Sequence, residues 1–169
     1  IIFTALATAA MGSIRASMNS RAEQQAIDFA TQALEKARQA EYYGLAHDSA
    51  DVLADSDVDP CGTTWCFDAD GPGGSATEEL AIQPGGSVNP HIETITSDVN
   101  NGTNFSVATY VTTPLSSGAD VKRVTVVTRW NIAGKQRERA SSSIVTATTR
   151  GLPIPLFTFK TASNTQAVN

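Results

Sequence analysis

Three aspartates at alternating positions are the residues of this sequence whose type and spacing suggest a specific chemistry. Asp55, Asp57 and Asp59 form the pattern D-x-D-x-D, and oxygen ligands at alternate positions are what calcium requires. Pro60 stands where a calcium loop of the EF-hand type needs glycine, and no glutamate follows at the distance that such a loop needs. Two interpretations stay open, a calcium-binding loop and a solvated acidic loop, and the missing glycine and glutamate favour the acidic loop.

The rest of the sequence contains no recognisable catalytic set. Only two histidines occur, His47 and His91, and their positions match neither a Ser-His-Asp triad nor an HExxH metal site. The run GPGG at 71–74 has no lysine after it and no strand-to-helix context, so it is not a phosphate-binding loop. We therefore predict that the protein is not an enzyme and that it uses no cofactor other than the calcium candidate.

The two cysteines lie close together and predict a disulfide. Cys61 and Cys66 enclose the residues GTTW. A pair of this spacing without further cysteines or histidines nearby falls short of the four ligands of a structural zinc site. A disulfide indicates an oxidising compartment outside the cytoplasm.

Length and composition fit one compact domain with an appendage. The chain has 169 residues, a formal net charge of -5 at pH 7 and a hydrophobic share of 41%. This is enough chain and apolar content for a hydrophobic core. The acidic balance argues against nucleic acid as a partner, because phosphate backbones attract basic surfaces.

The first fourteen residues, from Ile1 to Ile14, carry no charge. They are fewer than the roughly 20 apolar residues that a helix needs to span a bilayer. They also lack the basic leader and small-residue cleavage site of an intact signal peptide. Two interpretations remain, the end of a longer apolar helix that begins before this chain, or a buried core helix, and we favour the first.

Residues 1–46 are predicted to form one long helix, apolar over 1–20 and amphipathic over 21–46. The stretch contains no proline, and good helix formers dominate from Arg21 to Leu45. Such a helix is about 65–70 Å long, so one half must project from a small domain or pack against something outside it. Five alanines recur at steps of four and three and form a seam that suits close packing on a sheet of the same domain: Ala26, Ala30, Ala33, Ala37 and Ala40.

Residues 47–90 are predicted to be a connecting loop that holds the short disulfide, because Asp, Ser, Gly and Pro are dense there. Residues 91–150 are predicted to form an antiparallel sheet of three or four strands with one face covered by the alanine seam. The turn at Ala133-Gly134 predicts a hairpin. Alternation places one set of side chains on a common face of the two longest strands: Phe105, Val107, Thr109, Val111, Val124, Val126, Trp130 and Ile132.

The last segment, 151–169, is predicted to be an apolar stretch followed by a polar tail. Pro153 and Pro155 exclude a central strand. Leu152, Ile154, Leu156, Phe157 and Phe159 are too apolar to stay in solvent, so we expect them to pack on their own sheet or on a neighbour. The predicted fold class is α+β, a long N-terminal helix packed on a C-terminal antiparallel sheet.

This arrangement resembles the type IV pilin and pseudopilin superfamily. The stretch IIFTALATAAMGSIRASMNSRAEQQAIDFATQALEKARQAEYYGLA is similar to the second half of the apolar pilin segment running into its amphipathic helix. The stretch DVKRVTVVTRWNIAGKQRERASSSIVTATT is similar to the closing hairpin of many minor pilins and pseudopilins. Pilins carry a glycine-ended leader and then a start such as Phe-Thr-Leu-x-Glu, which is absent here. We expect roughly fifteen to twenty residues to precede Ile1, since about fifteen more apolar residues would complete a bilayer span.

The resemblance implies a structural subunit of a bacterial type IV pilus-like filament. The subunit would sit in the inner membrane before assembly, and its partners would be copies of itself or related pilins in an extracellular filament. Some pseudopilins bind calcium in a loop, which supports the calcium interpretation of the aspartates. The residues expected to pack in the filament core are Ile1, Ile2, Phe3, Ala5, Leu6, Ala9, Ala10, Met11, Gly12 and Ile14.

Two other functions stay open. One is a membrane-anchored extracellular binding or adhesion module on a helical stalk. The other is a helix-plus-sheet domain in which residues 1–14 are buried. The sequence preceding Ile1 distinguishes the filament subunit from the anchored module, and the behaviour of the purified chain without detergent tests the domain with a buried helix.

Overall fold

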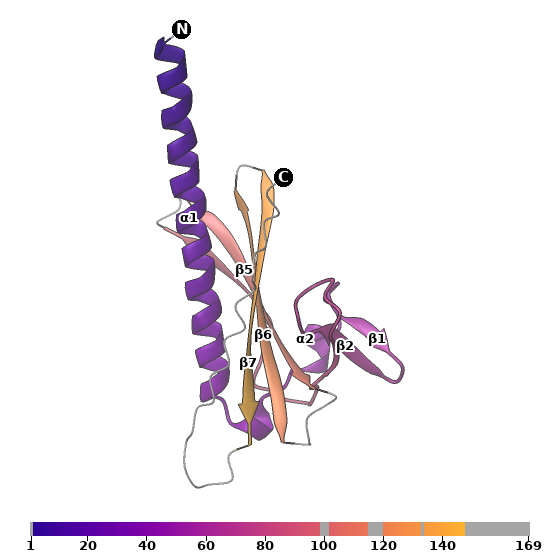
Figure 1. Cartoon of the computed structure of the whole chain (residues 1–169). Helices are drawn as coiled ribbons and strands as arrows, with labels where there is room; N and C mark the ends of the chain where they lie inside the picture. Colours follow the sequence, from indigo (N-terminus) through magenta and orange to yellow (C-terminus); the bar gives the residue numbers. More distant parts are fainter. Residues whose placement is uncertain (1, 99–101, 115–119, 133, 148–169) are drawn as a thin grey trace.

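The computed structural model describes residues 2–98, 102–114, 120–132 and 134–147, with only the backbone described for 2–12. The predicted α+β class is confirmed: a long N-terminal helix, α1 (Ile2–Gln39), lies along an antiparallel sheet and extends past its end (Figure 1). The tail that the sequence predicts to pack on the domain, residues 151–169, lies outside the described part of the chain.

The described sheet contains seven strands, more than the three or four that the sequence predicts. Its order is β1-β2-β3-β5-β6-β7, and β4 pairs with the first half of β5. The additional strands come from the connector, which also contains a short helix, so the segment 47–90 is not loop throughout. After α1 the elements are η1 (Tyr42–Gly44), α2 (Ser49–Val52), β1 (Asp59–Cys61), β2 (Thr64–Asp68), β3 (Thr77–Leu80), β4 (Ile92–Ser97), β5 (Thr103–Thr113), β6 (Val121–Ile132) and β7 (Lys135–Thr146).

The predicted hairpin is confirmed as the pair β6 and β7. The register runs without interruption from Ile132 opposite Lys135 to Val121 opposite Thr146. Gly134 in the connection has a φ of 74°, a conformation that glycine adopts without the strain that a side chain adds. The result is a long two-stranded ribbon whose turn points toward the N-terminal end of α1 (Figure 1).

One face of the sheet packs against α1, as the alternation of side chains predicts. Val107 and Val111 of β5 and Val124 and Val126 of β6 belong to one cluster with Ala30 and Ala37 of the helix. Nearer the hairpin turn, Phe105 and Trp130 pack with Ala22 and Ala26. Alanines suit this interface because a side chain of one carbon lets the helix backbone approach the sheet closely.

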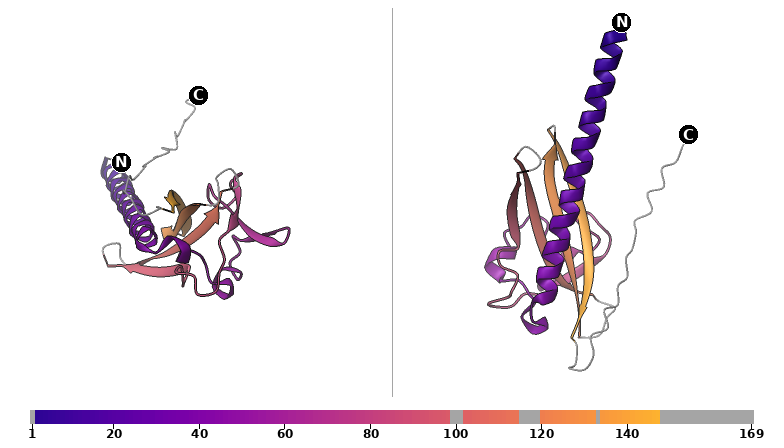
Figure 2. Two further views of the ribbon diagram at one scale, coloured as in Figure 1. Left: turned by 90° about the horizontal axis from the view of Figure 1, so that it is seen from below. Right: turned by 90° about the vertical axis from the view of Figure 1, so that its left-hand side faces the viewer.

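The opposite face of the sheet is covered as well, which was not predicted from the sequence. Val52, Val58, Phe67 and Leu80 of the connector pack with Ala108, Tyr110 and Val127 of β5 and β6. The rings of Phe67 and Tyr110 are stacked with centroids 3.8 Å apart. Strands β5 and β6 therefore lie between α1 on one side and the connector on the other, while the strands of the connector continue the same sheet (Figures 1 and 2).

Candidate functional site

Among the described residues, the side chains of α1 that lie beyond the buried seam have no cover from the domain. Every side chain from Ser13 to Ser20 is exposed, and Figure 2 shows the helix continuing past the strands. Ile14 is 60% exposed and Met18 is 42% exposed, although both are large apolar side chains. Burial begins at Ala22, so within the described side chains the helix is attached to the domain from Ala22 onward and is exposed from Ser13 to Ser20.

The predicted filament-core residues lie on this projecting half. Ile14 is the only member of that set whose side chain lies in the described part of the structure, and it is exposed. The backbone is helical from Ile2 onward, so the other members from Ile2 to Gly12 stand on the same helix. Among the described residues, no helix combines the length and the apolar character that crossing a bilayer requires.

The predicted alanine seam lies between α1 and the sheet. Ala26, Ala30 and Ala37 are buried, and Ala33 and Ala40 are half-buried. The sequence prediction omitted Ala22, which is fully buried and stands four residues before Ala26, at the spacing that continues the seam. The spacing of Ala22 indicates that it belongs to the seam, but its polar neighbours on either side kept it out of the predicted set.

A groove runs along α1 on the side of β4. Its volume is about 350 Å³, and it separates the helix from the residues that lead into β4. Its apolar lining includes Phe29, Ala33, Ala37, Val88, Ile95 and Val107, and Lys36 and Glu93 stand among the polar lining residues. This side of the helix is therefore less tightly packed than the side that faces β6 and β7.

Polar contacts hold both flanks of the attached half of α1. Glu23 accepts a hydrogen bond from Arg139 of β7 at 3.3 Å, and Arg38 donates to the hydroxyl of Ser143 at 2.9 Å. On the other flank, Gln25 accepts from the hydroxyl of Ser97 at 2.9 Å. These contacts fix the rotation of the helix, which small alanine side chains alone would specify poorly.

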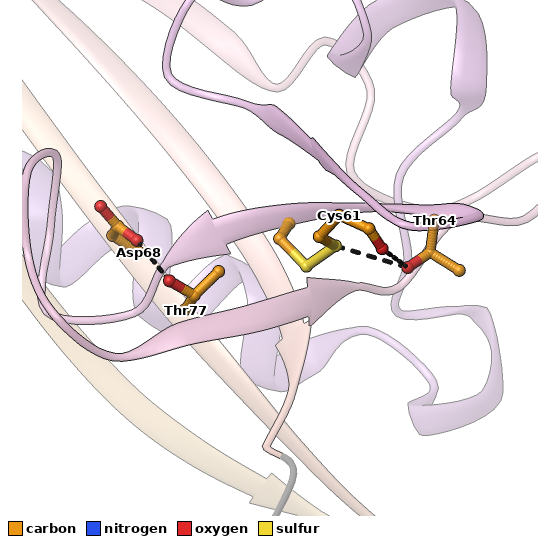
Figure 3. The surroundings of a disulfide bond; sticks show 5 residues. Cys61, Thr64, Asp68 and Thr77 are labelled. Carbon is orange, nitrogen blue, oxygen red and sulfur yellow. Dashed lines mark hydrogen bonds between the residues drawn. A yellow bond between two sulfur atoms is a disulfide. The ribbon is translucent and has the colours of Figure 1, made fainter.

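The predicted disulfide is confirmed between Cys61 and Cys66, whose Cα atoms are 5.8 Å apart. It closes the tight hairpin of β1 and β2 at the outer edge of the sheet (Figure 3). At the other end of β2, the hydroxyl of Thr77 donates to Asp68 at 3.0 Å (Figure 3). The disulfide thus stabilises a small ribbon at the edge of the sheet. This ribbon is only one of the parts of the connector that build the second core.

The three aspartates of the calcium candidate do not share one environment. Asp59 lies in β1 and is exposed, whereas the carboxylates of Asp55 and Asp57 converge on the hydroxyl of Tyr110, at 2.5 and 3.0 Å. Asp55 is also 3.1 Å from Nε2 of His91, and Asp57 accepts from Arg129 at 2.5 Å. Among the described residues, no group of three or more His, Cys, Asp or Glu is placed to hold a metal ion.

Asp55 and Asp57 belong to a largely buried polar network that crosses from the connector to the sheet. Burial alone would raise the pKa of Asp55, but hydrogen bonds from Tyr110, from the Asp57 backbone and from His91 outweigh it and hold that pKa below its ordinary value. Burial, together with the two carboxylates, raises the pKa of Tyr110 above its ordinary value. These shifts favour ionised aspartates accepting from a neutral tyrosine, an arrangement that fastens the connector to the sheet.

His47 is the second buried polar group of the connector. Its side chain is fully buried, and its Nε2 accepts a hydrogen bond from the backbone N–H of Val111 at 2.8 Å. Burial, assisted by the nearby His91, lowers the pKa of His47 to about 4. A neutral imidazole here occupies a place in the β5 backbone hydrogen-bonding pattern, which makes it a structural acceptor.

Two arginines of β6 complete the attachment of the connector. Arg123 contacts Glu78 of β3 at 3.0 Å, and Thr112 donates to the same carboxylate at 2.6 Å. Arg129 joins Asp57 to Glu138 of β7, at 2.5 and 2.6 Å. The sequence did not predict these pairs, although Arg123 and Arg129 both alternate with the helix-facing residues and so lie on the opposite face.

Comparison of the chain with protein-family models, with curated proteins and with solved structures found no match. The molecule is therefore described by its own architecture: a long N-terminal helix packed on an antiparallel sheet, with a disulfide-bonded connector on the far face.

Proposed function

We propose that the protein is a structural subunit of a bacterial type IV pilus-like filament and that it assembles through the N-terminal half of α1. The observation that carries the proposal is the division of this helix. Side chains from Ser13 to Ser20 are all exposed, Ile14 and Met18 among them, while the buried seam begins at Ala22. Apolar side chains that stand together on one exposed helix mark a site of contact with a partner or a membrane.

The uncharged run from Ile1 to Ile14 gives the chemistry of that partner. Before assembly the run lies in the inner membrane, and in the filament it exchanges lipid for the helices of neighbouring subunits. Both surroundings are apolar, so packing of small residues such as Ala9, Ala10 and Gly12 decides the fit between helices. The same contact repeated from one subunit to the next generates an open helical polymer.

The sheet and its connector then form the outer surface of the filament. The disulfide Cys61–Cys66 fits an extracellular location, where such bonds persist. The two cores on opposite faces of the sheet make the domain a firm base for the helix. In this arrangement the acidic connector supplies the surface that meets the surroundings.

The proposal is tested on filaments sheared from the source cells. An antibody raised against the folded domain is expected to label them along their length in immunogold electron microscopy. The peptide that carries the Cys61–Cys66 disulfide is expected in their mass spectrum. An antibody that labels only the cell envelope, with no filament recovered, would contradict the proposal.

The second candidate is a membrane-anchored binding or adhesion module that uses α1 as a stalk. The same projecting helix supports it, and the codons before Ile1 separate the two. A filament subunit is expected to show a glycine-ended leader followed by a start such as Phe-Thr-Leu-x-Glu. An anchored module is expected to show a long apolar span flanked by basic residues.

A further inference from the structure

Exposed cations gather at the end of the domain from which α1 projects. We define the hairpin patch as Arg15 of α1 with Lys135, Arg137 and Arg139 of β7, all of them exposed. The patch occurs in a protein whose formal net charge is -5. By contrast, residues 41–93 contain eleven Asp and Glu and no Lys or Arg. The connector is therefore purely acidic, and every Lys and Arg of the protein lies outside it.

Neighbouring residues show that the helix and the strand of the patch lie together. A hollow of about 210 Å³ is lined by residues of both, including Asn19, Glu23, Arg137 and Arg139, and Trp130 contributes to its lining. Arg15 stands four residues before Asn19, so it lies on the same side of the helix, one turn nearer the N-terminus. Lys135 stands two residues before Arg137, nearer the hairpin turn, and that turn points along α1 toward its N-terminal end (Figure 1).

Most of the patch is not neutralised by the protein. Arg139 contacts Glu23 at 3.3 Å, and the nearby carboxylate of Glu138 is taken by Arg129 at 2.6 Å. Within the described ranges, Arg15, Lys135 and Arg137 form no ion pair. Three exposed cations thus remain available to an anionic partner at this end of the domain.

We propose that the hairpin patch rests on the anionic phospholipid headgroups of the membrane while the apolar half of α1 is inserted. This inference rests on the proposed function, since it takes residues 1–14 to be the inserted segment. Arg15 is the first charge after that segment and so lies where the helix leaves the hydrocarbon. Lys135 and Arg137 lie beside the same part of the helix, which brings them to the headgroup level. A cation at that level strengthens binding to an anionic surface about fivefold.

The other partner of suitable charge is the acidic connector of a neighbouring subunit. The membrane is favoured because the patch lies beside the helix at the point where its uncharged run ends. A membrane that the helix enters must meet the domain at this point, whereas a neighbouring subunit need not. Contact with a neighbouring subunit remains an outcome of the test.

The test is flotation of the full 169-residue chain with lipid vesicles. Neutral phosphatidylcholine vesicles measure insertion of the helix, and vesicles with about 30% phosphatidylglycerol add the anionic surface. We expect roughly a hundredfold tighter binding to the anionic vesicles in about 20 mM salt, about fivefold for each of the three free cations, and loss of most of that gain in about 0.5 M salt. Lys135→Gln/Arg137→Gln is expected to lose roughly twentyfold on anionic vesicles and nothing on neutral ones.

Lys36→Gln is the matched control. Lys36 is an exposed lysine on α1 without an ion pair among the described residues, and it lies away from the hairpin turn. It is expected to bind both vesicles like the parent chain, whereas Lys135→Gln alone is expected to lose about fivefold on anionic vesicles. Equal thermal unfolding of all variants shows that surface charge, and not folding, is compared.

Equal flotation with neutral and anionic vesicles would overturn the patch proposal and leave the filament proposal intact. Patch-dependent binding to anionic vesicles without any binding to neutral ones would support the patch and contradict insertion of the helix. If the substitutions instead weaken self-association in sedimentation and leave vesicle binding unchanged, the patch faces a second copy of the chain and the lipid proposal is wrong.

Discussion

The hydroxyl of Tyr110 lies 2.5 Å from a carboxylate oxygen of Asp55, and this contact joins the central strand of the sheet to the connector. The ring of Tyr110 is stacked on Phe67 at the same place, so one residue takes part in both the apolar and the polar attachment. The far face of the sheet is therefore held by chemistry that differs from the alanine seam of α1.

Tyr110→Phe is expected to destabilise the protein by about 1.5–3 kcal/mol, because it removes a hydrogen bond to a buried charged group and keeps the ring in place. Urea denaturation at neutral pH measures the change. Tyr43→Phe is the control, since Tyr43 is 71% exposed and its hydroxyl is available to water. Equal loss of stability in both variants would contradict a special role for the contact with Asp55.

The free energy of unfolding is expected to fall as the pH decreases from about 6.5 to about 4, because of His47. The folded state holds the pKa of His47 at about 4, while the unfolded chain has a pKa of about 6.5. Between these two pKa values the unfolded state binds a proton on His47 and the folded state does not. The contribution of neutral His47 to the free energy of unfolding is therefore fully present above the unfolded pKa and is lost as the pH falls toward the folded pKa. The full effect is about 3 kcal/mol.

Denaturation curves across this pH range check the effect, and His47→Gln serves as its control. The glutamine keeps an acceptor for the N–H of Val111 but does not titrate, so its curve is expected to be flat between pH 6.5 and about pH 5. The lowered pKa values of Asp51 and Asp55 reduce the stability of both proteins below about pH 5, where the aspartates of the unfolded chain begin to bind protons. Their contribution is present above the ordinary aspartate pKa and is lost below it. A parent-like slope in His47→Gln would show that other groups cause the effect.

Ala26→Leu is expected to destabilise the domain by about 1–3 kcal/mol, because the added carbons must enter a tightly packed interface. Ala26 is completely buried, with a relative exposure of 0%. Ala16→Leu makes the same change on the exposed half of α1. The second variant is expected to leave the thermal midpoint of the isolated chain unchanged, and a comparable loss in both would contradict the division of the helix.

Removing the disulfide is expected to cost at most about 2 kcal/mol, because the loop that it closes is short and little chain entropy is involved. Cys61→Ala/Cys66→Ala is compared with the parent chain in denaturation experiments with and without reductant. The parent chain is expected to respond to reductant and the double variant is not. Complete unfolding on reduction would mean that the small β1–β2 ribbon supports the whole domain.

The helix and the helix-facing sheet residues could be predicted because each follows one strong period. Phe105, Val107 and Val111 alternate, and Val124 and Val126 continue the same pattern on the next strand. The alanine seam has its own spacing of four and three residues. In each case one apolar partner surface determines which positions are apolar, so the pattern can be recognised from the sequence alone.

The second core could not be predicted in the same way. Val52, Val58 and Phe67 come from three short segments separated by turns, and no segment is long enough to establish a period. The network around Tyr110 depends on contacts between residues far apart in the chain, such as Asp57 and Arg129. An acidic segment therefore resembled a solvated loop, although two of its aspartates pair with the sheet.

The lengthwise contact between α1 and the sheet has a mechanical consequence. Contacts at Glu23 and Arg38 tie the helix near both ends of its attached half to β7, and the seam lies between them. Tension along the helix axis loads all these contacts in parallel, as shear, whereas a sideways force would peel them apart one after another. A domain held by its projecting helix would thus resist pulling far better along the helix axis than across it.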